Sequence, residues 1–152
     1  MGVIIDRGFV SWDAAGGGGA VDVSADLMLE ASFLTDSKSG VAFTAFGGSR
    51  NVEFPGLIAA TTMTAQYRVP TDTSDVQYND AIAAWDGNLL QTFVFRTTSA
   101  AVGVTNHQYT VTGYLADGPI GGIVHGEFIK YMVNLNVHSV VFTDGTTTYT
   151  WN

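Results

Sequence analysis

The chain has 152 residues, with 14 Asp and Glu against 6 Lys and Arg, and its formal net charge is −8. This acidic balance excludes a nucleic-acid-binding surface built on clustered Lys and Arg. Only 13% of the residues are charged while 46% are hydrophobic, and an average soluble domain carries about 25% charged residues. We therefore expect one domain over residues 1–152, with much of its surface covered by other protein.

Several kinds of structure and location are not expected. The chain has no Cys, so it can form neither disulfides nor a thiolate metal site. No run approaches the roughly 18–20 apolar residues that span a bilayer, so no membrane partner is predicted. Residues 1–6 lack the basic and long apolar segments of a signal peptide. These features predict a protein made in a bacterial cytoplasm.

The first third of the sequence predicts strands and a flexible loop. Residues 2–12 read as a strand, and residues 13–20 as a Gly-rich loop because four glycines stand in a row. Apolar and polar residues alternate over 21–33, which predicts one long strand or two strands in line. The polar side of this segment carries Asp22, Asp26 and Glu30.

The middle of the chain predicts a turn at 35–40, a short apolar segment at 41–46 and an irregular stretch at 47–55. Residues 61–69 alternate again, so we expect a strand with Met63, Ala65 and Tyr67 on its apolar face.

A single helix is predicted at about 75–86. Ser74 and Gln77 fit the N-cap and N3 positions of a capping box, and Gly87 fits the residue that ends a helix. The helical spacing of its apolar residues predicts a stripe that packs on a sheet. That stripe consists of Tyr78, Ala81, Ile82 and Trp85.

The last third predicts strands at 90–97, 107–115 and 129–137, and then a hairpin. Asp144-Gly145 between two β-prone runs predicts a two-residue type I′ turn that places Phe142 opposite Thr147. The expected fold class is mainly β: a β-sandwich or barrel of about seven to nine strands with one flanking α-helix.

No constellation of catalytic residues is present in the sequence. It has no Gly-x-Ser-x-Gly elbow and no Gly-Lys-Ser/Thr phosphate loop. Its three histidines, at 107, 125 and 138, stand alone. We therefore predict no catalytic, cofactor-binding or metal-binding residues, and a protein that is not an enzyme.

The order of several short segments resembles the phage major tail tube proteins. In chain order, the segments are Val41–Gly47, Phe54–Leu57, the Thr-rich strand Ile58–Val69, and a helix with its Asp-Gly end at Tyr78–Gly87. They are followed by Thr112-Gly113-Tyr114, the strand Glu127–Val137 and the terminal segment Val141–Gly145. The resemblance covers roughly residues 41 to 145. It implies a β-sandwich with a flanking helix that forms hexameric rings, which stack into a hollow tube for passage of the genome or an effector. The implied partners are further copies of the chain, other tail proteins at the tube ends and DNA that passes without binding; the implied location is the virion tail.

Two sets of residues are predicted to serve assembly. We expect Asp22, Asp26 and Glu30 to face the channel, because an acidic wall repels phosphate and lets DNA slide. Apolar residues in the 46–57 region are expected to form ring or stacking contacts. These are Phe46, Phe54, Pro55 and Leu57.

Two other functions remain open at this point. One is a capsid decoration or cement protein, which forms compact trimers on a head surface. The other is a carbohydrate- or receptor-binding β-sandwich, which requires an exposed aromatic platform built from Trp12, Trp85 or Trp151.

Overall fold

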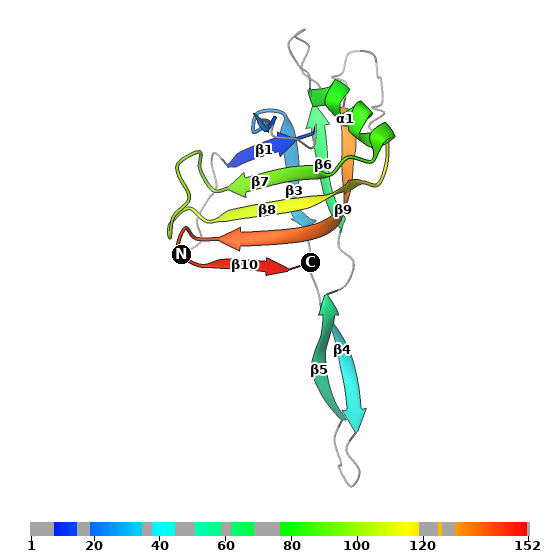
Figure 1. Ribbon diagram of the computed structural model, residues 1–152, viewed down its shortest axis with the longest axis vertical. Helices are drawn as coiled ribbons and strands as arrows, with labels where there is room; N and C mark the ends of the chain where they lie inside the picture. Colours follow the sequence, from blue (N-terminus) through cyan, green and yellow to red (C-terminus); the bar gives the residue numbers. More distant parts are fainter. Residues whose placement is uncertain are drawn as a thin grey trace.

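The computed structural model describes residues 8–14, 19–34, 38–44, 51–58, 62–68, 77–118, 125 and 130–151. This part of the chain is mainly β with one helix, as the sequence predicts (Figure 1). Eight of its strands form one antiparallel sheet in the order β2-β1-β7-β8-β9-β6-β3, with β10 paired to β9. The strands of this sheet are β1 (Phe9–Asp13), β2 (Val21–Asp22), β3 (Leu27–Leu34), β6 (Thr62–Arg68), β7 (Gln91–Arg96), β8 (Gln108–Leu115), β9 (Lys130–Thr143) and β10 (Thr148–Trp151).

The sheet curls into a half-barrel because the long strand β9 pairs with different strands along its length. The first half of β9 pairs with β6 and its second half with β10, while β8 follows it on the other side. The pairing of β8 with β9 skips His138 between the pairs Thr112–Ser139 and Gly113–Val137, which marks a bulge in β9; bulges bend and twist a strand. The corner after β2 is bonded to two strands: Val23 N–H donates to Val10 C=O of β1 at 2.9 Å, and Arg68 N–H of β6 donates to Asp26 C=O at 2.8 Å.

The core lies on the concave face of this sheet. Trp12 is fully buried, stacks on Phe93 with ring centroids 5.2 Å apart, and meets Tyr67 edge-on at 5.4 Å. The alternation predicted for 61–69 is confirmed, since Met63, Ala65 and Tyr67 are buried and the residues between them are not.

Two predictions for the first half of the chain are wrong. Residues 21–33 are not continuous: a turn at 24–26 separates β2 from β3, which pair with different strands, β1 and β6. The stretch predicted as irregular contains β5 (Asn51–Ile58), which pairs with β4 (Lys38–Thr44) in a separate two-stranded sheet. Figure 1 shows this hairpin extending away from the half-barrel.

The helix α1 (Gln77–Gly87) is present, but its predicted packing face is wrong in part. Ala81 and Ala84 are buried, whereas Ile82 and Trp85 are exposed. Small side chains let the helix lie close to its neighbours, and the larger apolar side chains then point outward. The predicted N-cap Ser74 lies outside the described residues.

The end of the helix differs from the prediction by one residue. Asn88 has a φ of 51° and is the left-handed residue that follows the helix. Leu89 N–H donates to Ala84 C=O at 2.9 Å, and Asn88 N–H to Trp85 C=O at 3.5 Å, which is the Schellman pattern. Gly87 is therefore the last helical residue.

The final hairpin has a longer turn than predicted. Thr143 pairs with Thr148 and Phe142 with Tyr149, so residues 144–147 form the loop. Gly145 has a φ of 86°, but Asp144 does not share the positive φ that a type I′ turn requires. The Asp144 side chain explains this: its Oδ1 accepts hydrogen bonds from the N–H groups of Thr146 and Thr147, at 2.9 and 2.6 Å.

Candidate assembly surfaces

The three acids predicted to face a channel lie in three different elements. Asp22 is exposed in β2, Asp26 is in the turn that follows, and Glu30 belongs to β3. The predicted premise, a single strand that carries all three on one side, does not hold. Asp22 Oδ1 accepts hydrogen bonds from Ser24 N–H at 3.0 Å and from Ser24 Oγ at 2.5 Å, so this carboxylate shapes the corner.

Asp26 has a structural partner. Its Oδ1 lies 2.6 Å from Nη2 and 3.0 Å from Nε of Arg68, and both guanidinium nitrogens donate to it. A backbone bond from Arg68 N–H to Asp26 C=O reinforces the pair. The ion pair therefore ties the β2–β3 corner to the end of β6, and Asp26 is not an isolated negative charge.

The predicted interface residues share one hairpin. Phe54 pairs with Val41 and Pro55 with Gly40, and Leu57 follows in the same strand β5. Phe46 lies outside the described residues. Proline is tolerated in β5 because a strand of a two-stranded sheet has a free side where no N–H is needed. The structure thus brings three of the four residues together on an extension of the half-barrel (Figure 1).

Among the residues that the structure describes, β10 has one neighbouring strand, and no sequence pattern predicted this. It pairs with β9 on one side, and its residues are Thr148, Tyr149, Thr150 and Trp151. Strand edges of monomeric proteins are usually protected by Lys, Pro or a bulge, and β10 contains neither of these residues. An uncharged edge of this kind is suited to pairing with another chain.

A row of aromatic side chains leads from the core to this open edge. Across β7, β8, β9 and β10, the opposite residues are Phe95, Tyr109, Phe142 and Tyr149. Phe95 is buried in the core, whereas Tyr149 is 61% exposed. Phe142 contacts Tyr109 and Tyr149, with ring centroids 5.2 and 6.3 Å apart. The concave face thus continues as an aromatic surface from the buried core at Phe95 to the exposed Tyr149 on β10.

The opposite face of the same strands is rich in hydroxyl groups. Thr112 Oγ1 and Ser139 Oγ share a 2.6 Å hydrogen bond, and Thr110 lies opposite Val94 and Val141. Arg96 is on this face, where its guanidinium carbon lies 4.2 Å from the centre of the Phe9 ring and Nη1 donates to Gln108 at 3.0 Å. Neutral side chains occupy positions where Lys and Glu are usual in a solvated sheet.

The turns at the β10 end of the sheet are held rigidly. Asn106 is buried and its side chain bonds Thr97 Oγ1, the N–H of Thr98 and the carbonyl groups of residues 98, 100 and 101. A Cβ at Gly145 would lie 3.3 Å from the Val102 carbonyl oxygen, so the two loops pack closely. Loop rigidity lowers the entropy cost of a contact made there.

The tryptophans do not form an exposed platform. Trp12 is buried in the core, where its Nε1 donates to Gln91 at 2.9 Å. Trp151 packs against the core from β10, and Trp85 is on the outer side of α1. The platform that a carbohydrate-binding protein requires therefore cannot combine these three residues.

No other chemical site emerges from the described residues. Within them, no three His, Asp or Glu side chains gather closely enough to hold a metal ion. The described part of the chain also contains no helix that is both long and apolar enough to cross a membrane.

Little in the sequence indicates that β10 has a single neighbour in the described part of the chain. The hairpin itself is predicted, but which strands stay unpaired depends on pairing between distant segments, and only the absence of charge in 146–151 hinted at this role.

Comparisons with known proteins identify relatives of the fold. No family model matches the chain, and no curated protein matches it by sequence. Among solved structures, a chain from the anti-feeding prophage (AFP) baseplate superposes with a TM-score of 0.65 at 11% identity, covering 97% of this chain and 99% of that one. A chain from the PVC sheath-tube complex of an extracellular contractile injection system, in the extended state, superposes with a TM-score of 0.61 at 11% identity, covering 94% and 92%. At this identity the likeness establishes the fold: nearly the whole chain has the architecture of a component of contractile injection particles.

Proposed function

We propose that this protein is a structural subunit of a phage-like tail, a tail tube protein that assembles into stacked hexameric rings around a hollow channel. The observation that carries the proposal is the uncharged edge of β10, which no described strand covers, next to the exposed aromatic row. Both features expose apolar surface that a monomer would leave in water. The solved chains of similar fold come from a baseplate and a sheath-tube complex, both of which are multi-subunit assemblies.

In this proposal the subunits of a ring meet through the β10 edge. A second copy can add one of its own edge strands there, so that backbone hydrogen bonds give affinity and the aromatic row gives apolar contact. Ring closure requires a heterologous contact, in which two different patches of the chain meet. The edge of β3, eight residues long, is the longest open edge of the main sheet in the described part and is the expected partner of β10.

The β4–β5 hairpin is proposed to connect one ring to the next. Because the hairpin extends away from the half-barrel, it can contact a subunit of the neighbouring ring. We expect Phe54 and Leu57 of β5 at this contact. The proposed location is the tail of a virion or related particle. Other tail proteins would bind the tube ends, and DNA or an effector would pass through the channel without being held.

The channel wall remains part of the proposal. Asp22, Asp26 and Glu30 are still proposed to face it, but as acids from three separate elements, of which Asp26 is already paired with Arg68. The net charge of −8 favours repulsion of DNA phosphates over binding. The role is non-enzymatic and uses no cofactor.

The test separates ring formation from stacking. Purified wild-type protein is expected to give hollow rods in negative-stain micrographs. The double variant Phe54→Asp, Leu57→Asp is expected to keep its far-UV circular dichroism but to stop at single rings. Rods of unchanged length from this variant would remove the hairpin from the stacking contact. Discrete trimers from the wild type would instead favour a capsid decoration protein.

A further inference from the structure

Arg96 carries a charge that no carboxylate in the described part of the chain balances. Arg68, the other arginine among the described side chains, pairs with Asp26, whereas Arg96 forms no ion pair. The Arg96 Nη1 donates to Gln108 Oε1 at 3.0 Å, and the guanidinium carbon lies 4.2 Å from the centre of the Phe9 ring. Its Nε is the one side-chain nitrogen or oxygen atom in the described part that is buried without a hydrogen-bond partner. A guanidinium is always charged in a protein, so we expect an anion to approach it from outside the described contacts.

Arg96 begins a row of side chains whose unused groups are hydrogen-bond donors. It lies opposite Gln108 on β8, and Gln108 lies opposite Thr143 on β9. Because Gln108 Oε1 accepts from Arg96, the Nε2 group of Gln108 remains to donate. Thr143 Oγ1 accepts from Gly145 N–H at 3.1 Å and from Thr148 Oγ1 at 3.2 Å, so its own O–H also remains to donate. Three neighbouring side chains therefore present donors to whatever contacts this face.

The row is held in place before any ligand binds. Arg96, Gln108 and Thr143 are all half-buried, and neighbouring strands lie about 4.8 Å apart, so adjacent donors of the row can reach one small anion. The Phe9 ring supports one face of the guanidinium, and the hydrogen bond to Gln108 fixes its direction. Donors that are partly buried bind an anion more strongly than fully hydrated ones, because water competes less for them. Little ordering is then needed on binding.

The donor chemistry of the row fits a carboxylate. A guanidinium offers two parallel N–H groups to the two oxygens of a carboxylate, and amide and hydroxyl donors complete such a site. A nucleic-acid backbone fits poorly, because phosphate binding depends on several clustered basic side chains and the net charge of the chain is −8. Asp144, next to Thr143 in the sequence, is not paired with Arg96, and its Oδ1 accepts from the N–H groups of Thr146 and Thr147.

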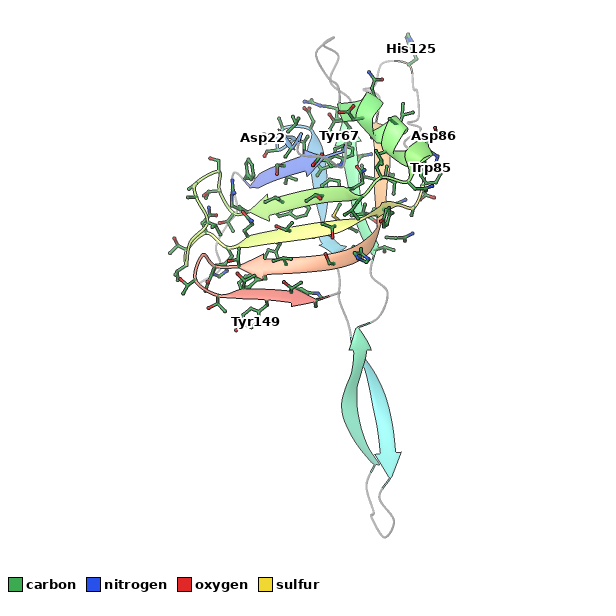
Figure 2. The ribbon with its side chains drawn as sticks, viewed as in Figure 1. Asp22, Tyr67, Trp85, Asp86, His125 and Tyr149 are labelled. Carbon is green, nitrogen blue, oxygen red and sulfur yellow. The ribbon has the colours of Figure 1, made fainter. Side chains whose placement is uncertain are left out.

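Two observations favour a second copy of the chain as the source of the carboxylate. The chain has 14 Asp and Glu against 6 Lys and Arg, so a copy that packs on this face brings acids more often than bases. The row also continues to Thr148, the first residue of β10, which lies opposite Thr143. Figure 2 shows Tyr149, the next residue of β10, at the outer edge of the half-barrel. Subunits are proposed to meet at this edge, so an acidic side chain of the adjoining copy can reach the row.

We propose that Arg96, Gln108 and Thr143 form a carboxylate-binding site, which an Asp or Glu side chain of a neighbouring copy occupies in the assembly. The inference rests on the proposed self-assembly and adds to it a residue-level contact. Arg96 supplies the charge and the paired N–H groups, and Gln108 and Thr143 supply further hydrogen bonds. Arginine is among the side chains that most often dominate the binding energy of an interface.

The first test measures self-association of the purified chain by analytical ultracentrifugation over a concentration series. Arg96→Gln is expected to weaken association about 10-fold or more, the effect of a dominant interface residue. Arg96→Lys is expected to keep part of the affinity, because it retains the charge without the paired N–H groups. Association of the wild type should weaken with added sodium chloride more than that of Arg96→Gln, since salt screens the ion pair. The matched control is Ala83→Glu, which changes the net charge by the same amount at an exposed position of α1 and should associate as the wild type does.

The second test uses sodium acetate as a free carboxylate and separates the two sources of the ligand. In ¹H–¹⁵N spectra of dilute wild-type protein, acetate is expected to shift the Arg96 Nε–H and Gln108 side-chain amide signals, and sodium chloride of equal ionic strength is not. Near-UV circular dichroism checks that each variant is folded.

The outcomes that overturn the proposal differ from one another. Acetate shifts together with wild-type association of Arg96→Gln would make this a site for a free anion and remove the second copy as its occupant. No acetate shift and no change in Arg96→Gln would remove the site itself. Equal weakening by Arg96→Gln and Ala83→Glu would assign the effect to net charge. A wild type that stays monomeric would contradict the tube proposal and the second copy as occupant, while the acetate spectra still decide whether the row binds a carboxylate.

Discussion

The indole N–H of Trp12 donates a 2.9 Å hydrogen bond to Oε1 of Gln91 at the centre of the core, where both side chains are fully buried. The Gln91 amide in turn donates to the carbonyl oxygens of Ala14 and Leu89, at 3.0 and 3.1 Å. One buried amide thus joins the end of β1, the start of β7 and the second residue after α1.

Loss of this amide is expected to destabilise the fold. In Gln91→Leu, the buried Trp12 N–H and two carbonyl groups lose their partner, and an unsatisfied buried donor costs about 1–3 kcal/mol. In urea unfolding, the free energy of unfolding of Gln91→Leu should be lower than that of the wild type by about 1–3 kcal/mol. In a Trp12→Phe background the same substitution should cost less, because no indole N–H is left unpaired; equal costs in both backgrounds would contradict the assigned role of the bond.

Gly113 is expected to resist substitution because of its closest neighbour. A Cβ at this position would lie 2.2 Å from the backbone carbonyl oxygen of Asn136, next to the bulge that bends β9. Gly113→Ala should lower the free energy of unfolding by about 1–3 kcal/mol, as overpacking does. Gly103→Ala is the matched control, since a Cβ there has no atom within 4 Å. Equal unfolding midpoints for the two variants would show that the strands separate easily at this point.

The turn before β10 should make stability depend on acid. Hydrogen bonds from the N–H groups of Thr147 and Thr146 lower the pKa of Asp144 below the ordinary value of 3.8. A lowered pKa means that the carboxylate stabilises the folded state above pH 3.8 and loses this effect as pH falls through the lower, folded-state pKa. Asp144→Ala should therefore unfold at lower urea concentration than wild type at pH 7, and the difference should shrink below pH 3.8. A difference that is constant with pH would mean that the carboxylate charge does not hold the turn.

Charged side chains on β10 should prevent another chain from pairing with its edge. Thr148→Lys with Thr150→Lys places two ammonium groups on the strand, and edge lysines oppose pairing with another chain. We expect a folded protein with an unchanged melting temperature that sediments as a monomer. The control is Asn79→Lys with Ala83→Lys, which adds the same charge at two exposed positions of α1, away from β10, and should still assemble. Loss of assembly in both double variants would point to net charge as the cause, and not to the β10 edge.

Strand alternation was predictable where one face of a strand is buried, as the buried Met63, Ala65 and Tyr67 of β6 show. Strand β5 was missed because Pro55 and Gly56 are typical of loops, and they are acceptable in this strand only because it belongs to a two-stranded sheet with free edges. No local pattern in the sequence reports how many neighbours a strand will have.

The helix shows a second limit of sequence patterns. Apolar spacing in 78–85 correctly predicted a helix, but the rule that large apolar residues face inward selected Ile82 and Trp85, whereas Ala81 and Ala84 are the buried ones. Which stripe is buried depends on how closely the helix approaches its neighbours, and this is set by tertiary packing. The exposed stripe therefore became visible only in the structure.

The most direct test of self-assembly is analytical ultracentrifugation of the purified wild-type chain over a range of concentrations, with negative-stain microscopy of the same samples. The tube proposal predicts species that grow in mass with concentration and six-fold rings or hollow rods on the grid. A single sedimenting species of 16.1 kDa at every concentration and ionic strength, with no rings on the grid, would contradict it.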